Sequence, residues 1–578
     1  MCNRSSAGVV LLSLLAVEVC CSAVASAEIE TAMPAGVSRG AIGVRQDDRS
    51  ITALVTSGFL DSASRQSRVL IVVDENRDGG DFAGQVQASW TRLAADVRQH
   101  AEIALVRLEK GTGAASFPPT GTSYQGPDPA AQYLWRWIGM AAPDLVIEVR
   151  AGESQGWRST REVADAVGHL ARNLRIETVP ESELPGGSLT AALAHGTPCD
   201  VGTVPGVLLE SSTVGAALHQ LASLVANKRL PQSAARVELQ GRSDRSPVEV
   251  ATELSRVYGH QLGSVAYIPS LALIGRLRLG ELTHDESHRQ DVLKIVAPYV
   301  DGRKSSLGNR PSGSTLSGHL VFGELADRTK NSRFVELACV AANLGFNEDG
   351  SQKPAMPYHS EMSDAVFMGT PILVQSGRLT GESKYFDMAA RHLRFMLKLN
   401  LRDDGLHQHS PVDPEHTAWG RGNGFPGLGL ALCLSDLPDD SPHRDEFLAA
   451  YRAHMAAMIQ HQDDTGMWHQ IVDHPESYRE FTVTCMTTFA ITRGLRRGWL
   501  DRETYEPVVR RAWDAIKLRV GPDGKLVDVC TGTGKQKSRR EYYHRAAILG
   551  RDDRGGAMAL MVSTEIAFAQ RENAVDLK

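Results

Sequence analysis

Two patterns of hydrophobic and polar positions divide the chain. Between residues 36 and 240, short runs rich in β-branched residues, such as 67–74 and 143–150, alternate with amphipathic stretches, such as 87–100 and 214–227. Apolar runs of that length are typical of buried parallel strands, and the stretches between them have helical spacing. The pattern predicts a small α/β domain in which helices cover an open sheet.

From about residue 248 the apolar positions recur every three or four residues, which predicts helix after helix. In a repeat architecture of this kind, each repeat is one helical hairpin, and the equivalent loops of all repeats lie on one face. We therefore predict a mainly α protein, with an (α/α)6 barrel (a six-hairpin toroid) over 246–572, preceded by a smaller α/β domain and a polar linker at 228–248. The repeat shows in Asp-Gly or Asp-Thr-Gly turns that return every 48 to about 60 residues, at 301–302, 349–350, 404–405, 464–466 and 523–524.

The composition is that of an ordinary globular protein, with 42% hydrophobic residues, 22% charged residues and a net charge of −6. Because there are no long basic runs, we expect no nucleic-acid partner. The five cysteines beyond residue 27 are far apart in sequence, which predicts neither a disulfide framework nor a zinc cluster. Oligomeric state leaves no mark on the sequence.

Residues 1–27 have the features of an export signal: an early arginine, an apolar stretch at 8–17 and a small-residue cleavage site ending at Ala27. The apolar stretch is too short to span a bilayer. We expect a secreted or periplasmic protein, cut after Ala27, with no membrane span in the mature chain. An uncleaved anchor is the alternative.

The polar segment 403–425 is the chemically richest part of the chain, with four acids, three histidines, a tryptophan and an arginine. Connecting loops are seldom this long or this rich in titratable groups. We expect one cleft to gather several of these side chains, with Trp419 as its wall; a solvated surface loop is the alternative. The candidates are His407, His409, Asp413, Glu415 and His416.

The α/β domain resembles the zinc carboxypeptidase-like fold in the order of its pieces. Enzymes with that fold hold zinc through a His-x-x-Glu pair after the first strand and a later histidine, because catalytic zinc takes three protein ligands and keeps an open position. Here the chain reads DENRD at 74–78, without such a histidine. The resemblance therefore implies a domain without its zinc ligands. Asp74, Glu75 and Asp78 are candidates for a hard cation, or form a solvated turn.

The helical part carries motifs in a fixed order: SGHLVFGELADRT at 317–329, SDAVFMGTPILVQSGRLTGESKYFDMAARH at 363–392, DGLHQHSP and AWGRGNGF within 404–425, TGMWHQIVDHPESYREF from 465, VCTGTG at 529–534 and DDRGGAMAL at 552–560. Over about 248–570 they resemble the unsaturated rhamnogalacturonyl hydrolases of glycoside hydrolase family 105 and the related unsaturated glucuronyl hydrolases. That family is built on (α/α)6 barrels.

The resemblance implies removal of a Δ4,5-unsaturated uronic acid from the non-reducing end of lyase-made oligosaccharides. The reaction is an acid-catalysed hydration of the vinyl ether, in which a carboxylic acid protonates C4 and water adds at C5. It implies an oligosaccharide partner with an unsaturated uronate terminus, and neither a metal nor another cofactor.

The family's acid/base precedes its Trp-x-Arg-Gly segment, which points to Asp413, with Glu415 as a rival because this loop is short. The family's second aspartate, which orients substrate and water, corresponds to Asp364; helix N-capping is the alternative there. His469 matches a histidine near the catalytic carboxylate, unless it is simply a buried structural histidine.

For substrate binding we expect stacking by tryptophans and pairing of the uronate carboxylate by an arginine fork. Trp419 and Trp468 can equally be core residues, and Arg493 and Arg496 can equally be surface cations. The full set of binding candidates is Trp419, Arg421, His409, Trp468, Arg493, Arg496 and Tyr543.

Two other interpretations remain open at this point. One is a non-catalytic glycan-binding protein that uses the same barrel cleft. The other is an amidase or peptidase in the α/β domain, which the missing zinc ligands argue against.

Overall fold

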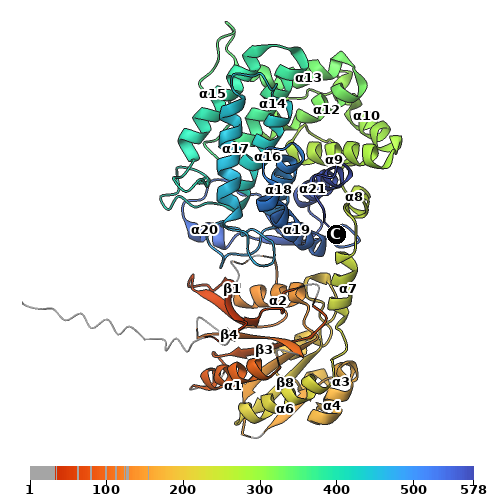
Figure 1. Cartoon of the computed structure of the whole chain (residues 1–578), viewed down its shortest axis with the longest axis vertical. Helices are drawn as coiled ribbons and strands as arrows, with labels where there is room; N and C mark the ends of the chain where they lie inside the picture. Colours follow the sequence, from red (N-terminus) through yellow and green to blue (C-terminus); the bar gives the residue numbers. More distant parts are fainter. Residues whose placement is uncertain are drawn as a thin grey trace, which may run out of the picture.

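The computed structural model describes residues 33, 35–61, 64–77, 81–97, 100–110, 114–122, 124, 129–153 and 155–577, so the predicted export signal lies outside it. An α/β domain and a larger helical domain follow one another along the long axis of the molecule (Figure 1). Among the described residues, no helix is both long enough and apolar enough to cross a membrane.

The α/β domain is built on one eight-stranded sheet with the order β1-β2-β4-β3-β5-β8-β6-β7. The central strands β4, β3, β5 and β8 are parallel, whereas β1, β2 and β6 join the sheet in antiparallel pairs. The strands are β1 (Val37–Val44), β2 (Ser50–Thr56), β3 (Ser67–Asp74), β4 (Ala101–Leu108), β5 (Leu145–Ala151), β6 (Gly156–Ser159), β7 (Glu177–Thr178) and β8 (Gly206–Ser211).

Side chains alternate across this sheet, so each face buries its own apolar set. In β3, Val69 and Ile71 face one core and Leu70 and Val72 face the other. The first core lies under α1 (Phe82–Val97), α3 (Arg161–Val167), α4 (His169–Leu174) and α6 (Val214–Asn227); the second lies under α2 (Pro129–Ala141) and α5 (Leu189–Leu193). The 228–248 segment contains α7 (Ala234–Ser243), which Ser233 caps.

The helical domain is a closed ring of parallel inner helices, each packed on the next, with the last returning to the first. The inner helices are α9 (Tyr267–Thr283), α11 (Gly313–Gly318) continued by α12 (Leu320–Thr329), α14 (Ala365–Thr380), α16 (Gly420–Asp436), α18 (Phe481–Arg496) and α21 (Asp553–Arg571). The outer helices are α8 (Pro247–Ser255), α10 (Glu286–Val300), α13 (Ser332–Ala342), α15 (Ser383–Asn400), α17 (Arg444–Ile459) and α19 (Arg502–Arg519). The predicted (α/α)6 barrel is confirmed.

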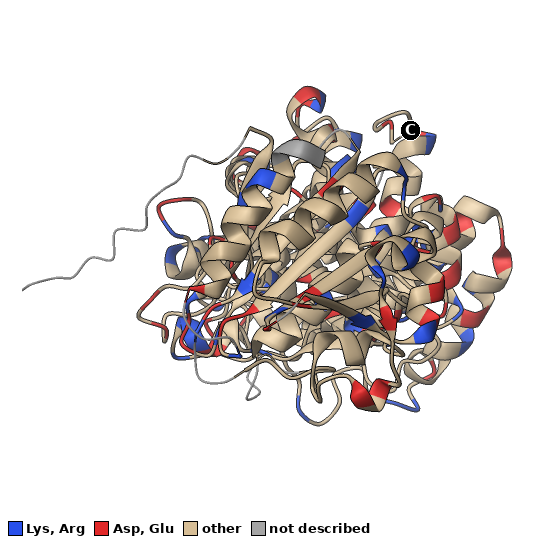
Figure 2. Ribbon diagram, turned by 90° about the horizontal axis from the view of Figure 1, so that it is seen from below, with Lys and Arg blue, Asp and Glu red and all other residues tan. Residues whose placement is uncertain are grey.

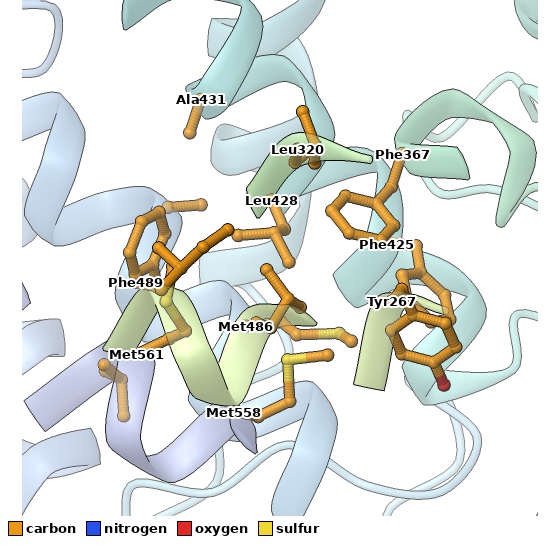
Figure 3. Close-up of a cluster of buried hydrophobic side chains, with 14 of the residues drawn as sticks. Tyr267, Leu320, Phe367, Phe425, Leu428, Ala431, Met486, Phe489, Met558 and Met561 are labelled. Atoms are coloured by element: carbon orange, nitrogen blue, oxygen red, sulfur yellow. The ribbon is translucent and has the colours of Figure 1, made fainter. Parts of the chain in front are cut away.

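The centre of the ring is filled by side chains from all sides, including Tyr267, Phe367, Phe425, Met486 and Met558 (Figure 3). The inner helices are therefore buried around most of their circumference and read as apolar on nearly every face. The interior of the barrel is a packed core, so the inner helices approach solvent mainly at the two ends of the ring.

The repeated turns connect outer helices to inner helices, as the sequence period predicted. Gly405 and Gly466 have φ values of +83° and +89°, which a side chain would strain. Each turn is followed by a loop that enters the amino end of an inner helix. The six amino ends consequently lie at one end of the ring, which we call the N-terminal mouth; the opposite end is the C-terminal mouth.

The α/β domain packs against loops of the N-terminal mouth through a buried cluster to which both domains contribute. Tyr124 of the α/β domain stacks on Tyr478 of the barrel with ring centroids 4.7 Å apart. Arg136 of α2 is buried between the domains and pairs with Asp528 of β9 (Leu526–Cys530) at 2.6 Å. The mouth loops therefore rest on the sheet domain.

The acids after β3 are occupied by arginines. Asp74 accepts a hydrogen bond from Arg77 Nε at 3.1 Å, and Glu75 pairs with Arg107 at 2.6 Å. Asp78 lies outside the described residues. Seen from below, basic and acidic residues are interspersed, and no large region carries residues of one charge alone (Figure 2).

Candidate active site

The N-terminal mouth has the electrostatics of an anion site. The amino ends of the inner helices leave backbone N–H groups without helical partners, and their dipoles place partial positive charge there. The structure gathers Tyr267, Asp364, His409, Arg421 and Tyr542 at this end of the ring.

Asp364 stands at the N-cap position of α14, but its side chain makes no capping hydrogen bond. Its Oδ1 is buried and has no hydrogen-bond partner among the described residues. The nearest polar group is His409 Nε2, at 3.5 Å. Buried carboxylate oxygens are normally filled, so this arrangement leaves Asp364 ready for another partner.

The proton on His409 can be placed from its neighbours. His409 Nδ1 lies 2.8 Å from the hydroxyl of Tyr542, and the backbone N–H of Gln536 donates to the same hydroxyl at 3.3 Å. Burial raises the pKa of Tyr542, so the phenol stays protonated and donates to His409. The His409 proton then sits on Nε2, pointing at Asp364.

Asp413 and Glu415, predicted as acid and rival, have other partners. Asp413 is 1% exposed, and its two oxygens accept the backbone N–H groups of Glu415 at 2.9 Å and Thr417 at 3.0 Å. Glu415 lies at the rim, where it accepts the backbone N–H of Arg539 at 2.8 Å. Asp413 therefore shapes the loop that carries His409.

The other histidines of the segment do not join this cluster. His407 is buried against His454, and burial lowers its pKa well below the usual value. His416 bonds Gln408 on the outside of the loop. Of the three histidines predicted to share a cleft, the structure brings only His409 to Asp364.

Trp419 and Arg421 pack against other parts of the N-terminal mouth. Trp419 is 1% exposed and packs against His409, with ring centroids 4.4 Å apart. Arg421 stacks on Trp419 and donates to the carbonyls of Cys530 at 2.8 Å and Thr531 at 2.7 Å. Both therefore hold neighbouring parts of the mouth in place.

Two residues of the mouth were not singled out from the sequence. Tyr267 begins α9, and Arg554 lies in the first turn of α21. Burial raises the pKa of Tyr267, while Arg421 and Arg554 next to it oppose that rise. The DDRGG motif was the only signal for Arg554; none pointed to Tyr267, because it enters the site only when the ring closes.

Three other predicted residues face elsewhere. His469 bonds the carbonyl of Ser477 at 2.6 Å through Nδ1 and faces Asp463 at 3.3 Å through Nε2. Trp468 is fully buried and donates to the carbonyl of Met458. The hydroxyl of Tyr543 donates to Glu476 at 2.5 Å.

Arg493 and Arg496 lie at the C-terminal mouth, far along α18 from its amino end. Both bind the fully buried Glu565, at 2.6 Å and 2.8 Å, and Arg278 of α9 joins them. Arg493 and Arg496, predicted as candidates to pair the substrate carboxylate, therefore already have an internal partner, at the helix carboxyl end that cations favour.

Among the described residues, no group of His, Cys, Asp and Glu is arranged to hold a metal ion. The cysteines at 199, 339, 433, 485 and 530 are free thiols.

A closed ring of six hairpins with a titratable cluster at one mouth is an (α/α)6 barrel with a candidate active site. The chain belongs to Glycosyl Hydrolase Family 88, whose family model matches residues 257–569, more than half of the 578 residues. The family resemblance seen in the sequence is confirmed.

Curated relatives include an unsaturated 3S-rhamnoglycuronyl hydrolase from Formosa agariphila, 31% identical over 28% of this chain and 48% of that protein. An enzyme of the same name from an Alteromonas species is 27% identical over 32% of this chain and 49% of its own. The unsaturated rhamnogalacturonyl hydrolase YesR of Bacillus subtilis is 25% identical over 31% and 52%. The chain thus spans about half the length of the curated relatives it matches.

Solved structures that align with the barrel include a family 88 glycosyl hydrolase from Bacteroides vulgatus, with a TM-score of 0.48 at 16% identity, over 56% of this chain and 99% of that one. A family 105 glycoside hydrolase from C. acetobutylicum aligns with a TM-score of 0.49 at 19% identity, over 56% and 99%.

Proposed function

We propose that this protein is an exported hydrolase that removes a Δ4,5-unsaturated uronic acid from the non-reducing end of lyase-generated oligosaccharides. The observation that carries the proposal is the buried, unbonded Oδ1 of Asp364, which faces His409 at the N-terminal mouth. Asp413, by contrast, has both oxygens filled by backbone N–H groups of its own loop. Family membership and the names of the relatives supply the reaction class.

In this proposal Asp364, rather than Asp413, is the general acid/base. The carboxylic acid gives its proton to C4, the π electrons of the C4–C5 double bond form the new C–H bond, and positive charge develops at C5 and the ring oxygen. Water then adds at C5 and returns a proton to the carboxylate. The hemiketal at C5 opens, which leaves a hemiacetal at C1 that releases the next sugar.

Neighbouring groups support each part of that reaction. His409 Nε2 faces the carboxyl group of Asp364 at 3.5 Å, and Tyr542 fixes the orientation of the histidine ring. Arg554 lies at the same mouth and contacts Asp552 through Nη1 at 3.4 Å, and its side chain is 17% exposed, so it can also face a ligand. We assign the substrate carboxylate to Arg554 and the helix amino ends, because a guanidinium fork and oriented N–H groups both favour an anion.

We further propose that the released sugar is rhamnose or a substituted rhamnose. The support is the activity stated in the names of the relatives, which are rhamnoglycuronyl and rhamnogalacturonyl hydrolases.

The test follows the ultraviolet absorbance of the conjugated unsaturated uronate, which hydration destroys. Lyase digests of rhamnogalacturonan, ulvan and chondroitin are incubated with the protein and with Asp364→Asn, Asp413→Asn and Glu415→Gln. We expect absorbance to fall on a rhamnose-containing digest and Asp364→Asn to abolish the loss. A loss abolished by Asp413→Asn or Glu415→Gln alone would move the acid to that residue. A flat trace on every digest would contradict the hydrolase and favour a glycan-binding protein.

Export is part of the proposal, and it rests on residues 1–27 alone. Amino-terminal sequencing of the protein recovered from its natural source should begin at Glu28. A sequence that begins at Met1 would contradict cleavage and support the uncleaved anchor.

A further inference from the structure

A cavity of about 340 Å³ lies between the two domains, and Asp364, His409 and Tyr542 are not part of its lining. The α/β domain contributes β1, β2 and α2 to its wall, and the barrel contributes α19 and the turn at 464–466. Binding pockets for small ligands have volumes of about 300–1,000 Å³. The cavity is therefore large enough for a ligand of sugar size.

One arginine in this wall, Arg519, makes no ion pair with a described carboxylate. Arg519 is 4% exposed, and its Nε is buried without a hydrogen-bond partner. Its only hydrogen bond runs from Nη1 to the carbonyl of Ala515 at 3.4 Å, and no described carboxylate lies within ion-pair distance. Burial lowers the pKa of Arg519, and the nearby carboxylates of Asp528 and Asp463 only partly oppose that shift. Buried charges are normally paired.

A second arginine also offers free donors. Arg479 uses its Nε for Asp463 and Thr465, which leaves its two terminal nitrogens without bonds to the described residues. The acids in the same wall are Asp61, Asp464 and Asp514. Asp514 pairs with Lys517 at 3.0 Å, and Asp464 is exposed to solvent.

The rest of the wall suits a sugar ring. Trp137 is 7% exposed, stacks on Phe59 and lines the cavity, and aromatic side chains pack well against the apolar face of a pyranose. Ser38 of β1 and Ser57, which follows β2, also line the cavity, whereas the Thr56 hydroxyl is bonded to Glu102 and to the N–H of Ile103. The combination of an aromatic wall, serine hydroxyl groups and guanidinium donors matches an acidic saccharide.

We propose that this interdomain cavity is a second, non-catalytic binding site for an oligouronate, whose carboxylate occupies the space beside Arg519. The ligand class follows the proposed function, but the site itself does not depend on it. A ligand held there touches both domains, so it fixes the α/β domain against the barrel.

The test uses saturated trigalacturonate, which lacks the double bond and so is not a substrate, and measures its affinity and stoichiometry by calorimetry. Ser57 is exposed and lies on the side of the cavity opposite Arg519. Ser57→Glu brings in a negative charge, and Ser57→Gln brings in a similar volume without one. We expect Ser57→Glu to weaken binding at one site at least tenfold, and Ser57→Gln to leave it within about twofold.

Removing one charge at a time on the barrel side of the cavity gives a matched pair of variants. Arg519→Gln should lose the same site, whereas Asp514→Asn should leave its affinity unchanged or higher. Maltotriose, which is neutral, should not bind there. All Ser57 variants should hydrolyse the unsaturated substrate at the normal rate, because the cavity is separate from Asp364.

Equal binding of trigalacturonate to Ser57→Glu and Ser57→Gln, or no binding to the unaltered protein, would overturn the proposal. Charge-dependent binding in a protein that fails to hydrolyse any unsaturated digest would refute the hydrolase and leave this site standing. The two proposals therefore fail by different measurements.

Discussion

Both ends of the barrel hold a buried carboxylate among basic groups, yet the two clusters differ in whether they are complete. At the C-terminal mouth, Glu565 is fully buried and receives Arg278, Arg493 and Arg496, so its oxygens are saturated. At the N-terminal mouth, Asp364 has one oxygen with no bond and a histidine at 3.5 Å. A complete network stabilises the fold; an incomplete one, kept buried, is available for chemistry.

The largest effect is expected from removing the acid at the incomplete end. Asp364→Asn should lower kcat about 10³-fold, the range for loss of a general acid/base, because an amide does not protonate C4. The absorbance assay measures it, and circular dichroism should show an unchanged fold. A variant that keeps more than a tenth of the activity would contradict the assignment.

Removing the carboxylate at the complete end should instead cost stability. Glu565→Gln leaves Arg278 and Arg493 without their anion, while Arg496 keeps Glu572, and breaking a buried ion pair costs about 3–5 kcal/mol. Chemical denaturation measures the loss, and kcat below the unfolding transition should stay close to normal. If kcat falls as steeply as in Asp364→Asn, the two ends are not functionally distinct.

The pH dependence of stability sharpens the same contrast. Burial opposes ionisation of Glu565, but Arg493 and Arg278 outweigh it and hold its pKa well below the usual value. The stabilisation is therefore present above the unfolded pKa of about 4.3 and is lost as pH falls towards the folded pKa. The difference in unfolding free energy between the unaltered protein and Glu565→Gln should shrink below about pH 4. A gap that stays constant down to about pH 3 would argue against this linkage.

A smaller effect is expected when the cluster keeps Asp364 but loses the hydrogen bond that orients His409. Tyr542→Phe keeps the ring but removes the hydroxyl that orients His409, and one hydrogen bond is worth about 1 kcal/mol, so kcat should fall about five- to tenfold. Tyr543→Phe is the matched control: its hydroxyl binds Glu476 instead, so kcat should not change.

The sequence predicted the ring better than it predicted the site. Helical spacing and the Asp-Gly period are local signals, and both were sufficient for the (α/α)6 barrel. Arg493 and Arg496 lie in the last turn of α18, which is buried on nearly every face, and the sequence does not show that Glu565 is their partner there.

Roles within the mouth depended on contacts that sequence does not record. Asp413 is an acid in a polar loop, but only the folded loop shows that its own N–H groups fill both oxygens. Asp364 was named from its motif, and its unbonded oxygen became visible only in the structure. Tyr267 and Arg554 come from the first and last inner helices, so only closure of the ring brings them together.

That closure sets an order of events during synthesis. Helix α21 packs on α8, α9 and α18, and it carries Arg554 into the mouth. Because domains generally fold from the amino terminus as the chain is made, the α/β domain, with a core of its own, can form early. The barrel has an open seam between α18 and α9 until α21 arrives. A nascent chain can therefore complete one core of the sheet domain early, but its N-terminal mouth is complete only after the last inner helix has been translated.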